Sequence, residues 1–432
     1  MPGVRRDTRL RRQRRNLTRS TKSQNAEGPG HAHLARSLGC PPRIAAPLCP
    51  PPAGRPSRYE DLVEGAGLEF HPLPADPFEI IQSAEGQELL AGPTNPCAVI
   101  RNINRVLEPR IGPILAAARA GAEGADLILA PAFSFIGVHL SQYLRVPHAV
   151  IRFQPSHPTR EFPHPLAPAA RFLGSLGNRL SFGAVDLGSW LVCRRFINPW
   201  RSKSPGLPAL PLTDPVRRIR RAPVLCAFSA TVVPRPTDWG PNVHMTGFWH
   251  HEQPQWQPPR RLLSFLDEGP PPVYVGFGSM RTQDPRATEH LVRTALRQVG
   301  LRGVLAGDPA TSEKDMLVAG GTLHDWLFSK MAAVVHHGGA GTTASALRAA
   351  VPFPVCPFFG DQAYWAGRVH SLGAGPEPLP ARHLSVPALA QRLRALVYKD
   401  RPRPGRPAHR PFAQGRGRAL PAPARSWTGS YR

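Results

Sequence analysis

The segment VVHHGGAGTTASALRAA, residues 334–350, concentrates residue types that could bind an anion. Two adjacent histidines are followed by three glycines within four residues and then by two threonines. The short, partly β-branched run at 331–335 predicts a buried strand, and residues 342–350 are rich in helix formers. The glycines are therefore predicted to lie in a strand-to-helix turn.

A turn of this kind has a physical use at a phosphate group. Glycine has no Cβ, so a ligand can approach the backbone closely, and the free N–H groups of the first helical turn favour an anion together with the helix dipole. Imidazole and hydroxyl groups add donors that suit phosphate oxygens. We expect an anion site, with a diphosphate as the first candidate, and a glycine-rich turn without a ligand as the alternative.

Length and charge limit the number of domains and the classes of partner. At 432 residues the chain has room for two domains, each with its own core. The formal net charge is +25 but uneven: residues 1–58 hold 13 Lys and Arg against 2 Asp and Glu, and residues 397–432 hold 9 against 1. The body between them carries only +6. Its charge therefore does not point to nucleic acid as a partner.

Both ends are poor in large apolar residues, so residues 1–30 and 397–432 are predicted to be disordered basic tails. The Arg-rich start is also compatible with a transit peptide, or with a nucleic-acid-binding arm that lacks interleaved aromatic residues. A wrong start or a shifted reading frame in a GC-rich gene would produce the same kind of sequence, and this is the interpretation that we favour.

The sequence contains no apolar stretch that approaches the roughly 18 to 20 residues of a membrane span. Its best candidate, residues 127–140, is interrupted by proline, glycine and histidine and is predicted to be a buried strand with the turn after it. The six cysteines form no CxxC pair and no metal-ligand spacing. We expect a cytoplasmic protein without a metal, and leave open a peripheral contact with membranes.

Strand-like and helix-like stretches alternate between the tails. Strands are predicted within 125–132, 148–155, 223–229, 272–280 and 303–307. A polar, proline-rich linker at 251–261 separates an N-terminal domain, 31–250, from a C-terminal domain, 262–396. The fold class is thus α/β, with two Rossmann-like doubly wound domains that bind ligands at the carboxyl ends of parallel strands.

Four motifs of the C-terminal domain, taken in their order along the chain, indicate a family resemblance. They are PVYVGFGSM at 272–280, HDWLF at 324–328, MAAVVHHGGAGTTASALRA at 331–349 and PFFGDQAYWAGRVHSLGAGP at 357–376. Together they resemble the donor-binding domain of GT-B glycosyltransferases that use nucleoside-diphosphate sugars, in particular the family 1 UDP-glycosyltransferases. The similarity spans about residues 59–396, and it implies a GT-B fold whose two domains face a cleft.

Motifs of the N-terminal domain narrow the resemblance. TREFPHP at 159–165, VVPRPTDW at 232–239 and VHMTGFWH at 243–250 are most similar to the sterol 3β-glucosyltransferase branch. The resemblance implies transfer of a hexose, with glucose as the family expectation, from a UDP-sugar to the hydroxyl of a sterol or another lipophilic acceptor. The implied mechanism is inverting and needs neither metal nor cofactor, because N–H donors stabilise the departing diphosphate.

The resemblance also assigns roles to single residues. The second histidine of the pair, His337, is expected to bind the donor diphosphate, while His336 is expected to be structural. The rest of the diphosphate cradle is expected from Ser279, Gly339, Gly341, Thr342 and Thr343. Asp361 and Gln362 would hold hydroxyls of the donor sugar. Trp326 would lie near the uracil, with a core position as the equal alternative.

The chain departs from the family at its front end. Relatives open with a strand and a loop resembling GTRGDVQP, whose aspartate is a candidate base for the acceptor hydroxyl. This chain has no such stretch; residues 31–39 match the helix after that loop and 43–47 the second strand. The N-terminal domain is therefore expected to be incomplete, and the catalytic base is unknown, with His157 and His164 as weak candidates.

Two hypotheses of different class follow. The chain is an active transferase that uses another base or another N-terminus, or it is a catalytically impaired homologue that binds nucleotide sugar without turnover. A lipid-linked N-acetylglucosaminyltransferase is a third GT-B alternative, which the HHGGAGTT and GDQ segments disfavour. Two smaller departures are Ala350, where relatives often carry glycine, and Pro354, which would remove a ladder hydrogen bond unless it lies at an edge.

Overall fold

The computed structural model describes residues 60–74, 83, 86, 96–131, 135–203, 206–250, 253, 256–278, 280, 284–307, 309–320 and 323–399. Residues 1–59 and 400–432, which include most of the predicted tails, lie outside this set. Among the single positions outside it is Ser279, one of the predicted diphosphate ligands.

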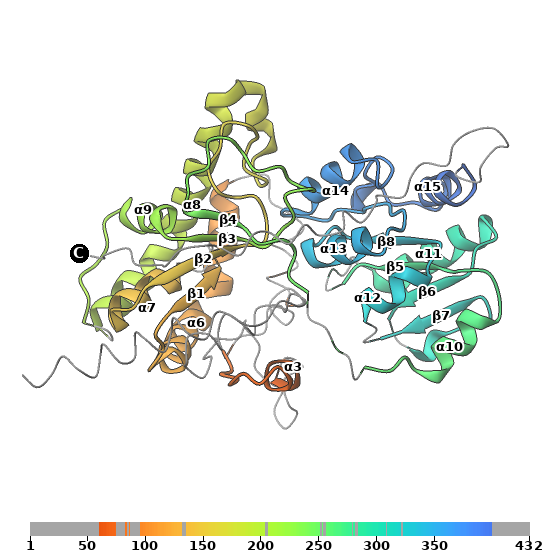
Figure 1. Cartoon of the computed structure of the whole chain (residues 1–432), viewed down its shortest axis with the longest axis horizontal. Helices are drawn as coiled ribbons and strands as arrows, with labels where there is room; N and C mark the ends of the chain where they lie inside the picture. The colour runs from red at the N-terminus through yellow and green to blue at the C-terminus, as the bar shows by residue number, and fades with distance from the viewer. Residues whose placement is uncertain are drawn as a thin grey trace, which may run out of the picture. The chain divides into compact units, whose positions relative to one another are not determined.

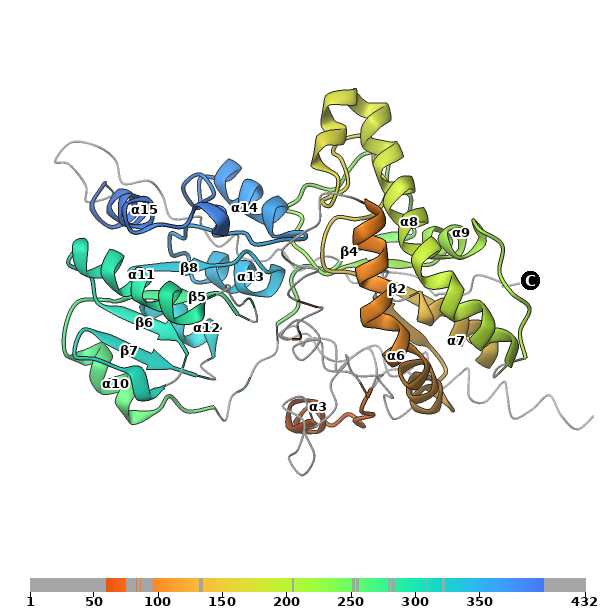
Figure 2. The same cartoon turned by 180° about the vertical axis from the view of Figure 1, so that it is seen from behind.

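The first sheet is formed by four parallel strands in sequence order. They are β1 (Ile128–Pro131), β2 (His148–Arg152), β3 (Val224–Cys226) and β4 (Val243–Met245). The helices around it are α6 (Pro96–Ala122), α7 (Ile136–Leu144), α8 (Gly174–Lys203) and α9 (Asp214–Arg221), with η2 (Pro168–Leu173) before α8 (Figures 1 and 2). Helix α6 packs against α8, and α7 packs against β1 and β2. Among the described residues, β1 pairs on one side only, and Leu129 on this strand is 40% exposed.

The second sheet is also parallel, but its strands change order in space. Its strands are β5 (Val273–Gly276), β6 (Gly303–Ala306), β7 (Met316–Ala319) and β8 (Ala333–His336), in the order β7-β6-β5-β8. The helices of this part are α10 (Arg260–Asp267), α11 (Pro285–Gln298), α12 (His324–Leu327), α13 (Ala340–Arg348), α14 (Gln362–Ser371) and α15 (Val386–Lys399). Because β5 lies between β6 and β8, the sheet has a topological switch point, where a crevice forms beyond the strand ends.

The α/β class and the two parallel sheets confirm the fold predicted from the sequence. The five strands predicted within 125–132, 148–155, 223–229, 272–280 and 303–307 are present in shortened form. The strand predicted at 331–335 lies at Ala333–His336, and the one matched to 43–47 lies outside the described residues. Helix α15 continues to Lys399, beyond residue 396 where the C-terminal domain was predicted to end. The shorter elements are α3 (Glu60–Gly65), η3 (Pro309–Thr311), η4 (Phe328–Lys330) and η5 (Ala381–His383). Across the described residues, no helix is both long and apolar enough to cross a membrane.

The second sheet is buried on both faces, as expected for parallel strands covered by helices. Val273 and Val275 of β5 pack on one face with residues of α11 and α15. Tyr274, which points to the opposite face, packs with Leu327 and Phe328 of the α12 segment. Alternate residues of one short strand thus hold the two helical layers together.

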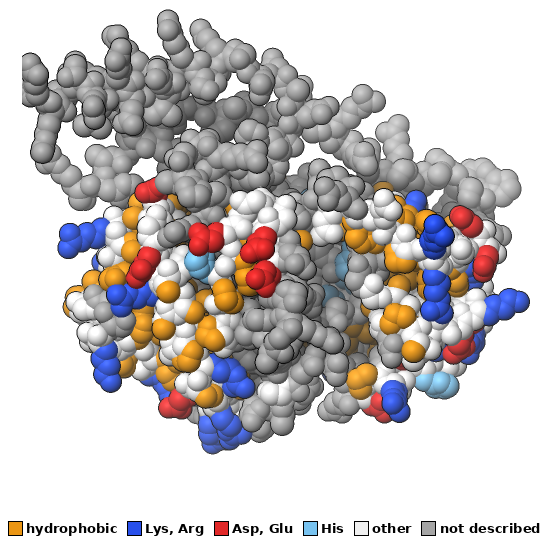
Figure 3. All heavy atoms as spheres, turned by 90° about the horizontal axis from the view of Figure 1, so that it is seen from below, with side chains coloured by type: hydrophobic (Ala, Val, Ile, Leu, Met, Phe, Trp, Pro, Cys, Tyr) orange, Lys and Arg blue, Asp and Glu red, His pale blue; other side chains and the backbone are white. Residues whose placement is uncertain are grey.

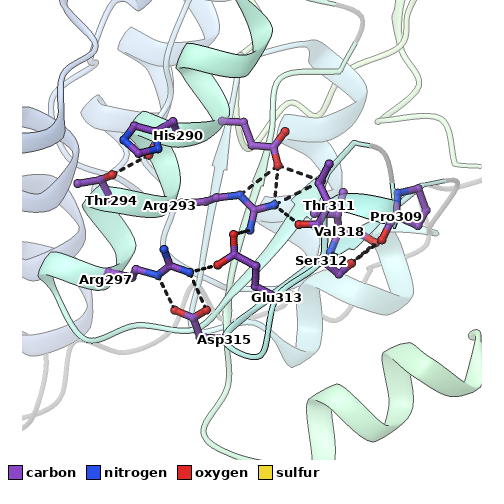
Figure 4. A network of polar contacts seen from close by, with 11 residues as sticks. His290, Arg293, Thr294, Arg297, Pro309, Thr311, Ser312, Glu313, Asp315 and Val318 are labelled. Atoms are coloured by element: carbon purple, nitrogen blue, oxygen red, sulfur yellow. Dashed lines mark hydrogen bonds and ion pairs between the residues drawn. The ribbon is translucent and has the colours of Figure 1, made fainter.

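An ion-pair network joins α11 to the segment between β6 and β7 (Figure 4). The guanidinium of Arg293 is almost buried and donates to Glu289, to Glu313 and to the carbonyl of Thr311 at 2.6 Å. Arg297, one turn later, pairs with Glu313 and Asp315. On the face seen in Figure 3, the acidic and basic side chains of the described residues are scattered among hydrophobic ones and form no continuous basic patch.

Pro354 has the effect predicted from the sequence. The N–H groups of Val334 and His336 in β8 donate to the carbonyls of Pro352 and Pro354, and the N–H of Cys356 donates back to His336. The bond that a residue 354 N–H would make to β8 is missing because proline has no donor. The segment consequently contributes an isolated bridge, between His336 and Val355, instead of a full strand.

Ala350 ends α13 in the left-handed region, with a φ of 55°. Because glycine is the favoured residue at this position after a helix, Ala350→Gly is expected to raise the free energy of unfolding by about 1 kcal/mol. Urea denaturation measures the change. The matched control is Ala349→Gly, at a φ of −70°, which should lower stability instead. A loss of stability in both variants would contradict the strain argument.

Candidate functional site

The candidate site lies at the switch point, where the loops after β5 and β8 meet. Strand β8 ends at His336, and α13 begins at Ala340 after a turn of three residues. Gly339 is the N-cap residue, and its carbonyl accepts the N–H of Thr343 at 2.9 Å. The N–H groups of the first helical turn have no acceptor within the helix. They are therefore available to an anion, as the strand–glycine–helix pattern predicts.

His336 stabilises the turn. Its ring is fully buried, and its Nδ1 accepts the N–H of Gly338 at 3.0 Å. Burial holds the pKa of this imidazole well below its usual value, so the ring is neutral and carries its proton on Nε2. Gly338 has a φ of 93°, a conformation that suits glycine. These contacts agree with the structural role expected for His336.

His337 is packed between two glycine backbones. A Cβ at Gly339 would lie 2.5 Å from its Nε2, and a Cβ at Gly278, in the loop after β5, would lie 2.8 Å from its Cε1. Both positions therefore need glycine for the ring to fit. Nδ1 of His337 is buried and has no hydrogen-bond partner among the described residues. Burial, and to a lesser degree His324, lowers the pKa of His337 to about 4. The ring is neutral near pH 7 and can donate one N–H to a ligand.

The other residues of the predicted cradle differ in access. Gly341 is exposed, with open space where a Cβ would be, so a ligand can reach its backbone. Thr342 is partly exposed, whereas Thr343 is buried, and its hydroxyl has no partner within the described part of the chain. Backbone groups and Thr342 are thus reachable from solvent, while the Thr343 hydroxyl lies inside the turn.

Asp361 and Gln362 stand together at the start of α14. Oδ2 of Asp361 accepts the indole N–H of Trp365 at 2.9 Å, and burial raises the pKa of the carboxyl. Oε1 of Gln362 accepts the N–H groups of Phe358 and Phe359 at 2.8 and 3.2 Å. The Gln362 oxygen is therefore committed to the loop, and its amide N–H groups are left to donate to a ligand.

A pocket of about 330 Å³ connects Asp361 with the end of β2. Its lining comprises Pro131, Ile151, Arg152, Phe153, Gln154, Ser156, Leu166, Gly360 and Asp361. The lining thus combines Asp361, a predicted sugar ligand, with the apolar residues Pro131, Ile151, Phe153 and Leu166. A lipophilic alcohol could contact these apolar residues while its hydroxyl lies near Asp361.

Sequence reasoning missed Arg152, the only arginine of the lining. Its side chain is 2% exposed and donates to the carbonyl and the hydroxyl of Ser156, both at 2.7 Å. Nε and Nη2 have no partner among the described residues. The available signal was an arginine at the carboxyl end of the apolar strand HAVIR, where polar side chains meet ligands in parallel sheets.

The two candidate bases are buried and do not line the pocket. Burial, then Arg152 and Arg220, lowers the pKa of His157 to about 3. Burial and Arg152 lower the pKa of His164 to about 4, and its Nδ1 accepts the N–H of Leu166 at 3.1 Å. Both rings are neutral near pH 7. A catalytic role for either histidine stays a prediction.

Two of the three motifs that pointed to the sterol branch, TREFPHP and VVPRPTDW, contact each other. Thr159 donates its hydroxyl to Asp238 at 2.7 Å, and the N–H of Arg160 donates to the same carboxylate at 2.9 Å. Glu161 in turn accepts the N–H and the hydroxyl of Thr237. These motifs therefore fix the loop after β2 to the loop after β3. Their pairing could not be deduced from two separate segments.

Trp326, predicted near the uracil, is half-buried on α12. Its ring lies 5.5 Å from that of Trp256, and the ammonium of Lys330 lies 4.7 Å from its centre. It also packs against the core on one side of the second sheet. Both readings of this residue, uracil contact and core aromatic, are compatible with that position.

Comparison with solved structures shows the fold. The chain resembles CalG4, the calicheamicin glycosyltransferase, with a TM-score of 0.52 and 18% identity over 79% of this chain and 80% of that chain. Residues 318–404 match the family described as erythromycin biosynthesis protein CIII-like, C-terminal domain. The fold is that of the GT-B glycosyltransferases, as the motifs predicted.

The chain is also similar in sequence to curated proteins. The chain is 35% identical over 359 residues to the sterol 3-beta-glucosyltransferase UGT80B1 of Arabidopsis thaliana, covering 80% of this chain and 58% of that protein. It is 30% identical to the sterol 3-beta-glucosyltransferase of Neosartorya fischeri, covering 80% of this chain and 25% of that protein. The chain is a homologue of the sterol 3-beta-glucosyltransferases, which confirms the resemblance, and it spans less than three fifths of these relatives' length.

His337 generates the first prediction for this site. His337→Ala is expected to weaken UDP binding by about 1.5 to 3 kcal/mol, the range for a hydrogen bond to a charged group. Isothermal titration with UDP measures the loss. His290→Ala is the control, because His290 lies on α11 and outside the turn and the pocket. Unchanged UDP affinity in His337→Ala would rule out its assignment.

The neutral histidines predict a pH dependence of stability. His139, His157, His164 and His337 have pKa values lowered by burial to about 3, 3, 4 and 4. In the unfolded chain a histidine becomes protonated below about pH 6.5, whereas in the folded protein these four stay neutral until pH approaches 4. The free energy of unfolding should therefore be constant above about pH 6.5 and fall as the pH drops from about 6.5 toward 4. Urea unfolding from pH 8 to 4.5 should show a plateau and then a decline. His157→Gln should make the decline less steep; an identical profile would contradict this account.

Proposed function

We propose that this protein transfers a hexose from a UDP-sugar, with UDP-glucose as the first choice, to the hydroxyl of a sterol or another lipophilic alcohol. The homology to sterol 3-beta-glucosyltransferases supports this class of reaction. The observation that carries the proposal is His337, a neutral imidazole held between two glycines beside the free N–H groups of α13.

The proposed reaction is a direct displacement with inversion. The acceptor oxygen forms a bond to the anomeric carbon as the bond between that carbon and the diphosphate oxygen breaks. Negative charge grows on the departing UDP, where the His337 N–H and the backbone N–H groups of the turn would stabilise it without requiring a metal. The proton of the acceptor hydroxyl passes to a base, for which His157 and His164 remain candidates.

The pocket supports an apolar acceptor. Ile151, Phe153 and Leu166 supply apolar contacts, and Asp361 in the same lining would hold the transferred sugar. The acceptor hydroxyl would then lie near the anomeric carbon. The decisive assay is transfer of radiolabelled glucose from UDP-glucose to a sterol, with His337→Ala as the inactive control. No transfer with any lipophilic alcohol would contradict the proposal.

A catalytically impaired nucleotide-sugar-binding homologue is the second candidate. It is favoured by β1, which pairs on one side only among the described residues and leaves Leu129 40% exposed. Titration with UDP-glucose separates the candidates when it is combined with hydrolysis and transfer assays. Binding without hydrolysis or transfer would support the second candidate.

Asp361→Asn tests the sugar contacts. Asparagine keeps an oxygen that can accept from Trp365, so the start of α14 should be preserved. The variant should bind UDP normally but bind UDP-glucose about 10-fold more weakly or worse, because a charge-assisted contact to a hydroxyl is lost. Competition binding with both ligands measures this. An equal loss for both ligands would place Asp361 away from the sugar.

A further inference from the structure

At the N-terminal end of α8, large apolar side chains are exposed and polar side chains are buried. Four large apolar residues of η2 and α8 are 62% to 77% exposed: Phe172, Leu173, Leu176 and Leu180. We call this set the apolar ridge. Monomeric soluble proteins seldom expose such a contiguous group unless it contacts a partner or a membrane. Figures 1 and 2 show this end of α8 extending past the strands of the first sheet.

The opposite face of the same helix is polar and buried. Asn178 donates to the carbonyl of Arg160 at 3.0 Å, and Ser181 donates to the carbonyl of Asn178 at 2.6 Å. The Ser181 hydroxyl accepts the N–H of His164 at 2.8 Å, and Phe182 beside it is fully buried. These contacts determine which face points inward. The ridge is consequently held outward by specific hydrogen bonds.

Two glycines fix the ridge in place. Gly174, between η2 and α8, has a φ of 65° and therefore suits the sharp change of direction there. A Cβ at Gly177 would lie 2.3 Å from the Cβ of Leu173 and 2.7 Å from the carbonyl oxygen of Ala170. Only glycine lets η2 pack this closely on α8. The ridge is thus a built feature with a defined shape.

Charge next to the ridge favours an anionic surface. Residues 165–185 contain two arginines and neither Asp nor Glu. The guanidinium of Arg171 lies 4.8 Å from the ring centre of Phe172, whereas Arg179 approaches Asp238 at 3.7 Å. A second copy that met the ridge by two-fold symmetry would bring the Arg171 side chains of both copies together. Lipid phosphates and anionic head groups complement Arg171 instead.

A short segment connects the ridge with the pocket in the sequence. Leu166, two residues before η2, lines the pocket and is itself 45% exposed. Phe153 combines the same two properties. Exposed apolar side chains therefore occur both on the ridge and at the pocket where the acceptor is proposed to bind.

We infer that the apolar ridge inserts into the interfacial layer of an anionic lipid bilayer and brings the pocket to the membrane surface. The binding step is independent of catalysis, while the delivery of a membrane-embedded acceptor to the pocket rests on the proposed function. Phe172, Leu173, Leu176 and Leu180 would enter the boundary between head groups and acyl chains, and Arg171 would contact lipid phosphate.

Sedimentation of the full chain with lipid vesicles tests the inference. Phe172→Glu/Leu176→Glu should bind about 10-fold less than wild type, or weaker, to vesicles of phosphatidylcholine with phosphatidylserine, because two apolar contacts are lost and like charge is added. The matched control is Leu191→Glu, 48% exposed and three helical turns beyond Leu180 on α8, which should bind like wild type. All variants share the basic termini, so these cancel in the comparison.

A second variant separates the two contributions to binding. Arg171→Gln should lose about fivefold on the phosphatidylserine vesicles, as expected for one cation near an anionic surface, and little on phosphatidylcholine alone. Equal vesicle binding by wild type and the double glutamate variant overturns the inference. The inference is also overturned if wild type forms a dimer in sedimentation equilibrium, the double glutamate variant does not, and neither protein binds vesicles.

Transfer assays distinguish this inference from the proposed function. With a sterol carried by cyclodextrin, the double glutamate variant should transfer glucose like wild type; with a sterol embedded in vesicles, its rate should fall in parallel with binding. Absence of transfer in both formats contradicts the proposed function, while the vesicle result alone decides on the ridge. An unchanged rate on vesicle-embedded sterol would overturn its role in delivery.

Discussion

The packing of His337 between Gly278 and Gly339 is the constraint on which the candidate donor site depends. The two glycines come from loops that follow β5 and β8, which are neighbours although more than fifty residues separate them in the sequence. Only a parallel pair brings the carboxyl ends of two strands to the same edge of a sheet. The contact therefore requires that β5 and β8 are parallel neighbours. A Cβ on either side would displace the imidazole, and with it the single N–H that a neutral ring can donate.

Further elements follow from this arrangement. Gly338 packs against Val355, where a Cβ would come within 2.8 Å of the valine methyl, so the Pro354 segment supports the turn from behind. The same segment leads into α14, whose Trp365 is fully buried in the core that also contains Phe228, from the loop after β3. Trp365 holds Asp361 by its indole N–H. The predicted phosphate and sugar contacts are thus parts of one packed unit.

Local patterns were enough to predict the strand-to-helix turn that contains His337, because the turn is encoded by consecutive residues. The roles predicted for His337, Asp361 and Gln362 came from the family resemblance. Burial depends on tertiary packing and could not be deduced: Thr343 is enclosed although Thr342 beside it is partly exposed. Arg152 escaped notice because a single arginine at a strand end is a weak signal without the pocket around it. The predictions for residues 1–59 and for Ser279 concern positions outside the described part of the chain.

Two departures from ordinary burial rules meet at the same pocket. Arg152 is a buried cation with two nitrogens that have no partner among the described residues, and desolvation lowers the pKa of its guanidinium. Leu166, which lines the same pocket, is a large apolar residue that is 45% exposed. Both features cost stability, since charge prefers water and apolar surface avoids it. Sequences generally agree with the burial rules except where function demands otherwise, so these two violations at one pocket support the proposal that the pocket binds a ligand.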